Sequence, residues 1–165
     1  MTDIFRKPRA GPIRLLIYIA IFAGLALALN GWIFTTGAGD WASSLENPSW
    51  APAGPIIGAV WVMLFTLMAV SLWLVDRAGQ LEARDPARAL ILAQYVVNLS
   101  WVWFYFGLQN VANGFYVTVV ALALSIATLI AVWRANPNAA LVFLPLPLWL
   151  VFALALSYAT WQLNA

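Results

Sequence analysis

Long apolar segments separated by short polar ones dominate the chain. Five of these segments have about the 20 residues that a helix needs to cross a bilayer, and charged residues, proline or asparagine stand between them. The predicted spans are residues 13–34, 56–75, 87–109, 114–133 and 139–163. Pro86 stands just before the third span, a position where its missing N–H costs no helical hydrogen bond. We therefore expect an all-α integral membrane protein with a single five-helix domain over residues 1–165.

The first connection, residues 37–55, does not resemble a flexible linker. It contains two tryptophans, Trp41 and Trp50, and three prolines, of which Pro48 and Pro52 flank Trp50. Large aromatic side chains favour burial, and proline reduces the entropy that is lost when a segment becomes ordered. We expect this connection to form an ordered cap over one end of the bundle.

The composition excludes several classes of protein. Hydrophobic residues make up 64% of the chain and charged residues 8%, against roughly 45–50% and 25% in soluble domains. The chain has no cysteine and no histidine, which excludes disulfides, thiolate catalysis and the usual haem ligands. The interiors of the spans hold no Asp, Glu, Lys, Arg or His, which argues against a proton pump or an antiporter. We predict no catalytic residue, no metal site, no required cofactor and no nucleic-acid partner.

The basic residues indicate the orientation in the membrane. With five spans, all eight fall on one side: Arg6, Lys7, Arg9, Arg14, Arg77, Arg84, Arg88 and Arg134. Basic residues favour the cytoplasmic side, so we expect a cytoplasmic N-terminus, an outside C-terminus and an outside 37–55 connection. A basic start and an apolar run also occur in signal peptides, but this run reaches Phe34, too far for that assignment. A bacterial inner membrane is the expected location.

Two polar and aromatic stripes suggest where a ligand binds. Residues three or four apart share one face of a helix. The third span carries Gln94, Asn98, Trp101 and Tyr105 in this spacing, and the fifth carries Pro145, Trp149, Ala153 and Ser157. If the stripes face one another, they form an aromatic cleft with a few polar groups, as in small-molecule pockets. The alternative is polar contact between helices without any ligand.

Small residues follow one face of the first span at Ala20, Gly24 and Ala28. Such stripes allow close contact between helices. The contact is either packing within the bundle or a homodimer interface.

The loop and both stripes resemble motifs of one known family. The loop reads Trp41-x3-Leu45-x-Asn47-Pro48-Ser49-Trp50-x-Pro52 and is followed by Gly58 and Trp61. This pattern is similar to a signature of the translocator protein / tryptophan-rich sensory protein family (TspO/MBR). Gln94-x3-Asn98-x2-Trp101-x5-Gly107 and Pro145-x3-Trp149 resemble its third-helix and fifth-helix motifs.

The resemblance implies a five-helix bundle, often dimeric, whose pocket opens under the first loop. It implies binding of porphyrins and related tetrapyrroles, and a role in regulating tetrapyrrole or carotenoid pigment synthesis. A porphyrin or carotenoid is then the expected bound molecule, beside membrane lipid. We expect the ligand-binding residues to be Trp41, Trp50, Trp61, Gln94, Asn98, Trp101, Trp149 and Ala153.

Two other functions stay open at this point. The chain could be a structural or assembly subunit of a larger membrane complex, such as a photosynthetic pigment–protein assembly. It could also degrade porphyrin in light, which would rely on indole photo-oxidation, since residues for other chemistry are absent. Binding as a sensor or carrier is the leading hypothesis.

Overall fold

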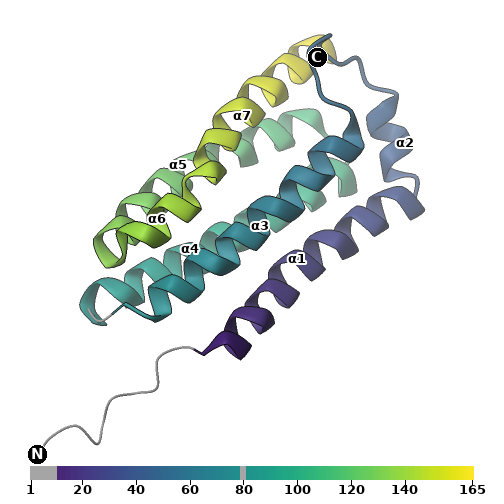
Figure 1. The fold of residues 1–165 in the computed structure, drawn as a ribbon. Coiled ribbons are helices and arrows are strands. Elements are labelled where there is room, and N and C mark those ends of the chain that lie inside the picture. Colours follow the sequence, from purple (N-terminus) through teal and green to yellow (C-terminus); the bar gives the residue numbers. More distant parts are fainter. Residues whose placement is uncertain (1–10, 79–80) are drawn as a thin grey trace, which may run out of the picture.

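The computed structural model describes residues 11–78 and 81–165, which form a bundle of five membrane-length helical segments (Figure 1). The long helices are α1 (Pro12–Thr35), α3 (Gly54–Asp76), α4 (Leu81–Val102), α5 (Val111–Ala135) and α7 (Pro145–Leu163). The shorter elements are α2 (Ala38–Ser43), the π-helix η1 (Trp103–Gly107), which extends α4, and α6 (Pro137–Phe143), which leads into α7. The predicted all-α fold with five spans is confirmed.

Local sequence signals start several of these helices. Pro12, Pro55 and Pro137 lie in the first turns of α1, α3 and α6, where a missing N–H costs nothing. Asn110 caps α5 by accepting a hydrogen bond from the backbone N–H of Asn113 at 2.9 Å. Asn136 caps α6 in the same way, accepting from the backbone N–H of Asn138 at 3.0 Å.

Two proline positions differ from the sequence prediction. Pro86 lies inside α4, which already starts at Leu81, and it forfeits only the bond that its N–H would have made to the Glu82 carbonyl. The fifth span is not one continuous helix, because a turn at Leu144 separates α6 from α7. Pro145 and Pro147 lack the N–H groups that would carry the hydrogen-bond ladder through this turn.

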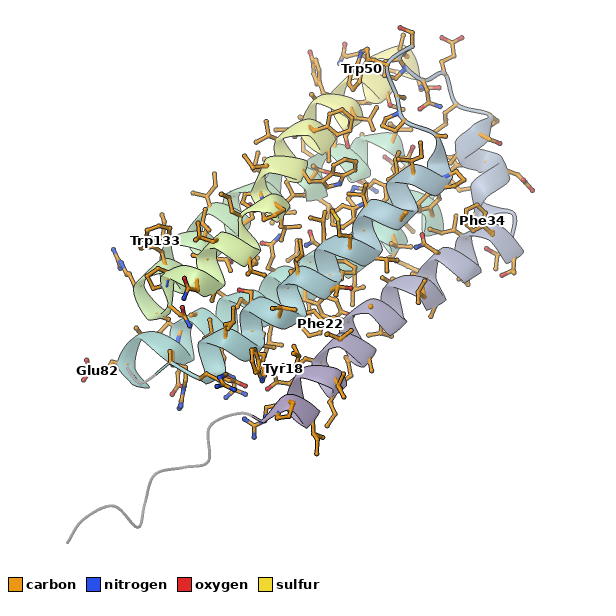
Figure 2. All side chains as sticks on the ribbon, in the orientation of Figure 1. Tyr18, Phe22, Phe34, Trp50, Glu82 and Trp133 are labelled. Atoms are coloured by element: carbon orange, nitrogen blue, oxygen red, sulfur yellow. The ribbon has the colours of Figure 1, made fainter. Side chains whose placement is uncertain are left out.

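The core of the bundle lies where α3, α4, α5 and α6 meet. Met68, Ile91, Val132 and Phe143 are almost completely buried there. Helix α1 packs on the outside, mainly against α3, with Tyr18 and Phe22 directed toward it (Figure 2). Phe22 stacks on Tyr95 of α4 with ring centroids 4.0 Å apart.

The small-residue stripe does not pack within the bundle. Ala20, Gly24 and Ala28 are exposed on α1, and a Cβ added at Gly24 would meet nothing within 4 Å. The expectation of packing inside the bundle is therefore wrong for these residues, since α1 turns Phe22 and Ala26 toward its neighbours instead. The homodimer through this stripe stays a prediction.

The two ends of the bundle differ in charge. At one end, Arg14 and Arg88 approach the carboxylate of Asp76, whose side chain is only 2% exposed, with N–O distances of 3.7 and 3.3 Å. The connection from α1 to α3 lies at the other end, near the C-terminus (Figure 1). This arrangement agrees with the predicted sidedness, which stays a prediction, and Arg6, Lys7 and Arg9 lie outside the described residues.

Candidate ligand-binding cavity

A large cavity lies between the helices below the connection from α1 to α3. Its volume is about 600 Å³, within the roughly 300–1,000 Å³ of small-molecule sites. Helices α1, α3, α4, α5 and α7 all contribute to its wall, and none of its described lining residues is charged. The cavity therefore suits an apolar ligand with few polar groups.

The 37–55 connection forms the roof of this cavity. Asn47, Pro48, Ala51 and Pro52 line it from above, together with residues of α2. The roof is fixed to α7 by Asn164, whose Oδ1 accepts from the Glu46 N–H at 3.0 Å and whose Nδ2 donates to the Glu46 carbonyl at 2.8 Å. The connection therefore covers one end of the bundle, and α2 makes up part of this cover.

One wall consists of stacked aromatic rings. Trp101 and Tyr105 stack with centroids 4.5 Å apart and planes 14° from parallel. The Trp101 Nε1–H donates to the Gly114 carbonyl at 3.0 Å and to Thr118 Oγ1 at 3.1 Å. Because this donor is already used within the protein, Trp101 offers the ligand a ring surface and no hydrogen bond.

Gly114 makes room for this wall. A Cβ at this position would meet the Tyr105 ring (Cδ2), a contact that a side chain cannot tolerate. The ring of Tyr105 therefore lies directly against the backbone of α5, and Trp101 stacks on the same ring.

The π-helix η1 shapes the upper part of the same wall. Short π segments inside α-helices are frequent at functional sites. Here Tyr105 and Phe106, which are neighbours in sequence, both line the cavity. Their rings also contact Trp41 of α2, with centroids 5.1 and 6.4 Å away. The π-helix η1 thus brings the wall of the cavity into contact with its roof. No motif in the sequence predicts this π-helix.

Two residues of the cavity wall carry a buried hydrogen-bond donor without a partner. Asn98 Nδ2 and Trp149 Nε1 are buried and have no hydrogen-bond partner in the structure, and both residues line the cavity. A buried donor without a partner costs about 1–3 kcal/mol. An acceptor atom that reached these donors would remove that cost.

The two predicted stripes face the same space. Asn98, Trp101 and Tyr105 of the first stripe and Trp149, Ala153 and Ser157 of the second all line the cavity. Gln94 lies behind Asn98, fully buried, and Pro145 is also outside the lining. The expected cleft between these helices therefore exists.

Five of the eight predicted ligand-binding residues line the cavity. These are Trp61, Asn98, Trp101, Trp149 and Ala153. Trp50 does not: it is 50% exposed at the tip of the roof (Figure 2) and contacts Phe152 at a centroid distance of 5.8 Å. Their contact with a ligand stays a prediction in every case.

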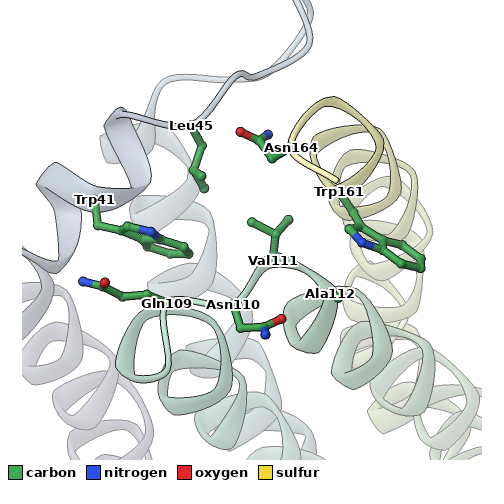
Figure 3. A pocket seen from close by; sticks show the side chains of 8 residues that line it. All are labelled: Trp41, Leu45, Gln109, Asn110, Val111, Ala112, Trp161 and Asn164. Carbon is green, nitrogen blue, oxygen red and sulfur yellow. The ribbon is translucent and has the colours of Figure 1, made fainter.

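Trp41 lines a different and smaller pocket on the other side of α2. This pocket has a volume of about 290 Å³ and lies between the roof, the start of α5 and the end of α7. Figure 3 shows Trp41 and Leu45 on one side and Trp161 and Asn164 on the other. Because Gly39 and Ala42 line the large cavity, α2 separates the two spaces.

The site also contains residues that the prediction omitted. Asn30 of α1 lines the cavity, and its Nδ2 donates to the Gly58 carbonyl of α3 at 3.5 Å. Asn30 is a polar residue within an otherwise apolar span, a usual sign of contact between membrane helices. Phe65 and Ala121 also line the cavity, and no sequence signal separates them from ordinary core residues.

The arrangement provides binding groups rather than metal ligands. Within residues 11–78 and 81–165, no three acidic side chains come together as a candidate metal site. Aromatic rings, amides and hydroxyls make up the functional part of the wall. The fold and this cavity define an integral membrane protein with a five-helix bundle around a space for a small, mainly apolar molecule.

Comparison with known proteins gives the family. The profile of the TspO/MBR family matches residues 16–162, and the chain belongs to this family. It is similar to Protein CrtK of Rhodobacter capsulatus, with 32% identity over 155 residues, which cover 91% of this chain and 94% of CrtK. The tryptophan-rich protein TspO of Archaeoglobus fulgidus is 30% identical over 147 residues, covering 88% and 95% of the two chains.

A more distant relative comes from animals. The translocator protein of Homo sapiens is 28% identical over 134 residues, which cover 79% of this chain and 79% of the human protein. The resemblance stated from the loop and helix motifs is therefore confirmed.

Proposed function

We propose that this protein is a membrane-embedded sensor or carrier that binds a flat, apolar, pigment-like ligand of the tetrapyrrole class. In this role it would regulate tetrapyrrole or pigment metabolism in a bacterial inner membrane. The observation that carries the proposal is the pair of unpartnered donors, Asn98 Nδ2 and Trp149 Nε1, which belong to two residues in the wall of an uncharged aromatic cavity.

The geometry of the cavity supports a planar ligand. Trp61, Trp101 and Trp149 lie in its wall, and large aromatic surfaces stack well on flat rings. The carbonyl or carboxylate oxygens at the rim of such a macrocycle are acceptors that would pair with the two donors. Without histidine or cysteine in the chain, the usual axial ligands of haem are missing. The proposal therefore favours a metal-free porphyrin or a related pigment.

Names of relatives support a regulatory role. One relative in Cereibacter sphaeroides is called tryptophan-rich sensory protein and is 30% identical over 142 residues. A sensor needs a binding site whose occupation changes the protein, and the roof above the cavity is the part of the chain that a ligand would contact first from outside.

The direct test is purification from the native membrane in mild detergent, followed by an absorption spectrum and mass analysis. A pigment present at close to one per chain, without another polypeptide, supports the proposal and gives the ligand class. A stoichiometric partner polypeptide that carries the pigment would instead favour an assembly subunit.

A titration with protoporphyrin IX tests the site itself. Quenching of tryptophan fluorescence reports binding, and we expect Trp149→Ala to weaken it about tenfold or more, since a stacked ring and a donor are both lost. Trp133→Ala is the matched control, because Trp133 is exposed at the opposite end of the bundle (Figure 2). Equal affinity in all three proteins would contradict the proposed site.

A further inference from the structure

We propose that Gln94 is a positioning residue: it orients the Asn98 amide so that the cavity offers a ligand hydrogen-bond donors and not acceptors. We call this preference the polarity of the cavity. Through Asn98, Gln94 makes the cavity select flat ligands with an acceptor, such as a ring carbonyl, over similar ligands with a donor. This inference rests on the proposed function and deepens it. Gln94 itself does not line the cavity, so its effect is indirect.

The polarity starts at a backbone carbonyl of α5. The Gln94 Nε2 donates to the Ala121 carbonyl at 3.2 Å, across the interface between α4 and α5. A carbonyl only accepts hydrogen bonds. Gln94 is fully buried, and the reversed amide would place its Oε1 against the Ala121 oxygen. The backbone of α5 therefore fixes which end of the Gln94 amide faces Ala121.

Gln94 passes this polarity on to Asn98. Its Nε2 also donates to Asn98 Oδ1, at 3.3 Å, one helical turn along α4. Asn98 must then turn its oxygen toward Gln94 and its nitrogen away. This agrees with the finding that Asn98 Nδ2 is the buried donor left without a partner at the cavity. The Ala121 carbonyl therefore orients the Gln94 amide, and the Gln94 amide in turn orients the Asn98 amide.

A second donor from another helix has the same polarity. The Trp149 Nε1–H of α7 is also buried and unpartnered, and Trp149 lines the cavity. An indole nitrogen can only donate. A ligand carbonyl satisfies these groups. A ligand N–H in the same place would face donors and leave them unpaired, and buried unpaired groups are the strongest source of discrimination between otherwise similar ligands.

Three tricyclic probes of nearly equal size test the inference. Fluorenone carries an acceptor, carbazole carries a donor, and fluorene carries neither. We expect the wild-type protein to bind fluorenone about fivefold to tenfold more tightly than carbazole, as one hydrogen bond gained or lost in a buried site predicts. In Gln94→Leu, Asn98 loses the partner that orients it, so the ratio should fall at least about twofold. The Trp149 donor keeps part of the preference for fluorenone, and fluorene affinity stays within about twofold.

Gln162→Leu is the matched control, because Gln162 is exposed on α7 and lies outside the cavity. It should keep the wild-type ratio. A second measurement uses only the wild-type protein, in case Gln94→Leu does not fold. In protein with ¹⁵N-labelled asparagine, the Asn98 side-chain NH₂ signal, assigned with Asn98→Leu, should shift with fluorenone and move little with carbazole.

The outcomes separate this inference from the proposed function. Two results would overturn the inferred preference for ligands with an acceptor. They are equal wild-type affinities for fluorenone and carbazole, and an Asn98 signal that does not move when fluorenone is bound. A ratio that Gln94→Leu leaves unchanged would overturn the role of Gln94, while ligand binding itself would stand. Binding of none of the three probes would overturn this inference, whereas the titration with protoporphyrin IX decides the proposed function separately.

Discussion

The side chain of Asn164, near the end of α7, makes two hydrogen bonds with the backbone of Glu46 in the roof: it accepts from the Glu46 N–H at 3.0 Å and donates to the Glu46 carbonyl at 2.8 Å. These residues are 118 positions apart in the sequence. The Asn164 Nδ2 also donates to the Thr160 carbonyl of its own helix at 2.7 Å, which holds the amide in place. The Asn164 side chain thus attaches the roof of the cavity to α7, in addition to the contact between Trp50 and Phe152.

Removing this attachment should loosen the roof. In Asn164→Ala, the two bonds to Glu46 are lost, each contributing about 0.5–1.5 kcal/mol. We expect hydrogen exchange of the Glu46 amide to become at least about tenfold faster, and a bound porphyrin to dissociate faster. Gln162→Ala serves as the control on the same helix. Unchanged exchange at Glu46 would show that other contacts hold the roof.

Gly114→Ala should destabilise the protein. The added Cβ meets the ring of Tyr105, which is stacked on Trp101, and overpacking of this kind costs about 1–3 kcal/mol. A lower Tm in detergent is the expected result. Gly24→Ala is the matched control, because its Cβ meets nothing within 4 Å and alanine is the better helix former. A Tm equal to the wild-type value in Gly114→Ala would mean that the aromatic wall can shift at little cost.

Tyr18→Phe should weaken the attachment of α1 at the end opposite to the roof. The Tyr18 hydroxyl donates to the buried carboxylate of Asp76 at 2.6 Å. A hydrogen bond to a charged group contributes about 1.5–3 kcal/mol, so a clear drop in Tm is expected. Tyr158→Phe, at an exposed tyrosine of α7, should leave Tm unchanged. Equal Tm values for both variants would contradict a stabilising role for this bond.

The sequence predicts that Trp50 and Trp149 both bind the ligand, whereas only Trp149 lines the cavity in the structure. Comparison of Trp50→Phe and Trp149→Phe tests which of the two affects binding. Both substitutions keep an aromatic ring and remove an indole N–H. Trp149 has its unpartnered donor at the cavity, whereas Trp50 lies outside the lining. Fluorenone affinity should fall about fivefold in Trp149→Phe and stay unchanged in Trp50→Phe. An equal loss in both variants would show that the roof closes over the ligand and brings Trp50 to it.

The predicted orientation can be tested with single cysteines, since the chain has none of its own. Ser44→Cys lies in the exposed part of the roof, and Glu82→Cys lies at the opposite end of the bundle (Figure 2). In intact bacterial cells, a thiol reagent that cannot cross the inner membrane should label Ser44→Cys and leave Glu82→Cys unlabelled. The reverse pattern would place the N-terminus outside.

Much of the architecture follows from the sequence alone. The five spans and the family were predictable, because each depends on properties that are local in the sequence. Apolar length determines which segments cross a membrane. Helical spacing determines that Asn98, Trp101 and Tyr105 share a face, and the structure places all three at one cavity.

The tertiary structure alone determines which tryptophans reach that cavity. Trp41 and Trp149 are both tryptophans in family motifs, yet α2 turns Trp41 into the smaller outer pocket and Trp149 lines the larger one. Long-range contacts also decide the direction of the Asn98 amide, since it depends on the Ala121 carbonyl of another helix. Periodicity assigns a residue to a face of its own helix. Only the packing of the helices against one another decides what that face meets and which of its donors are left for a ligand.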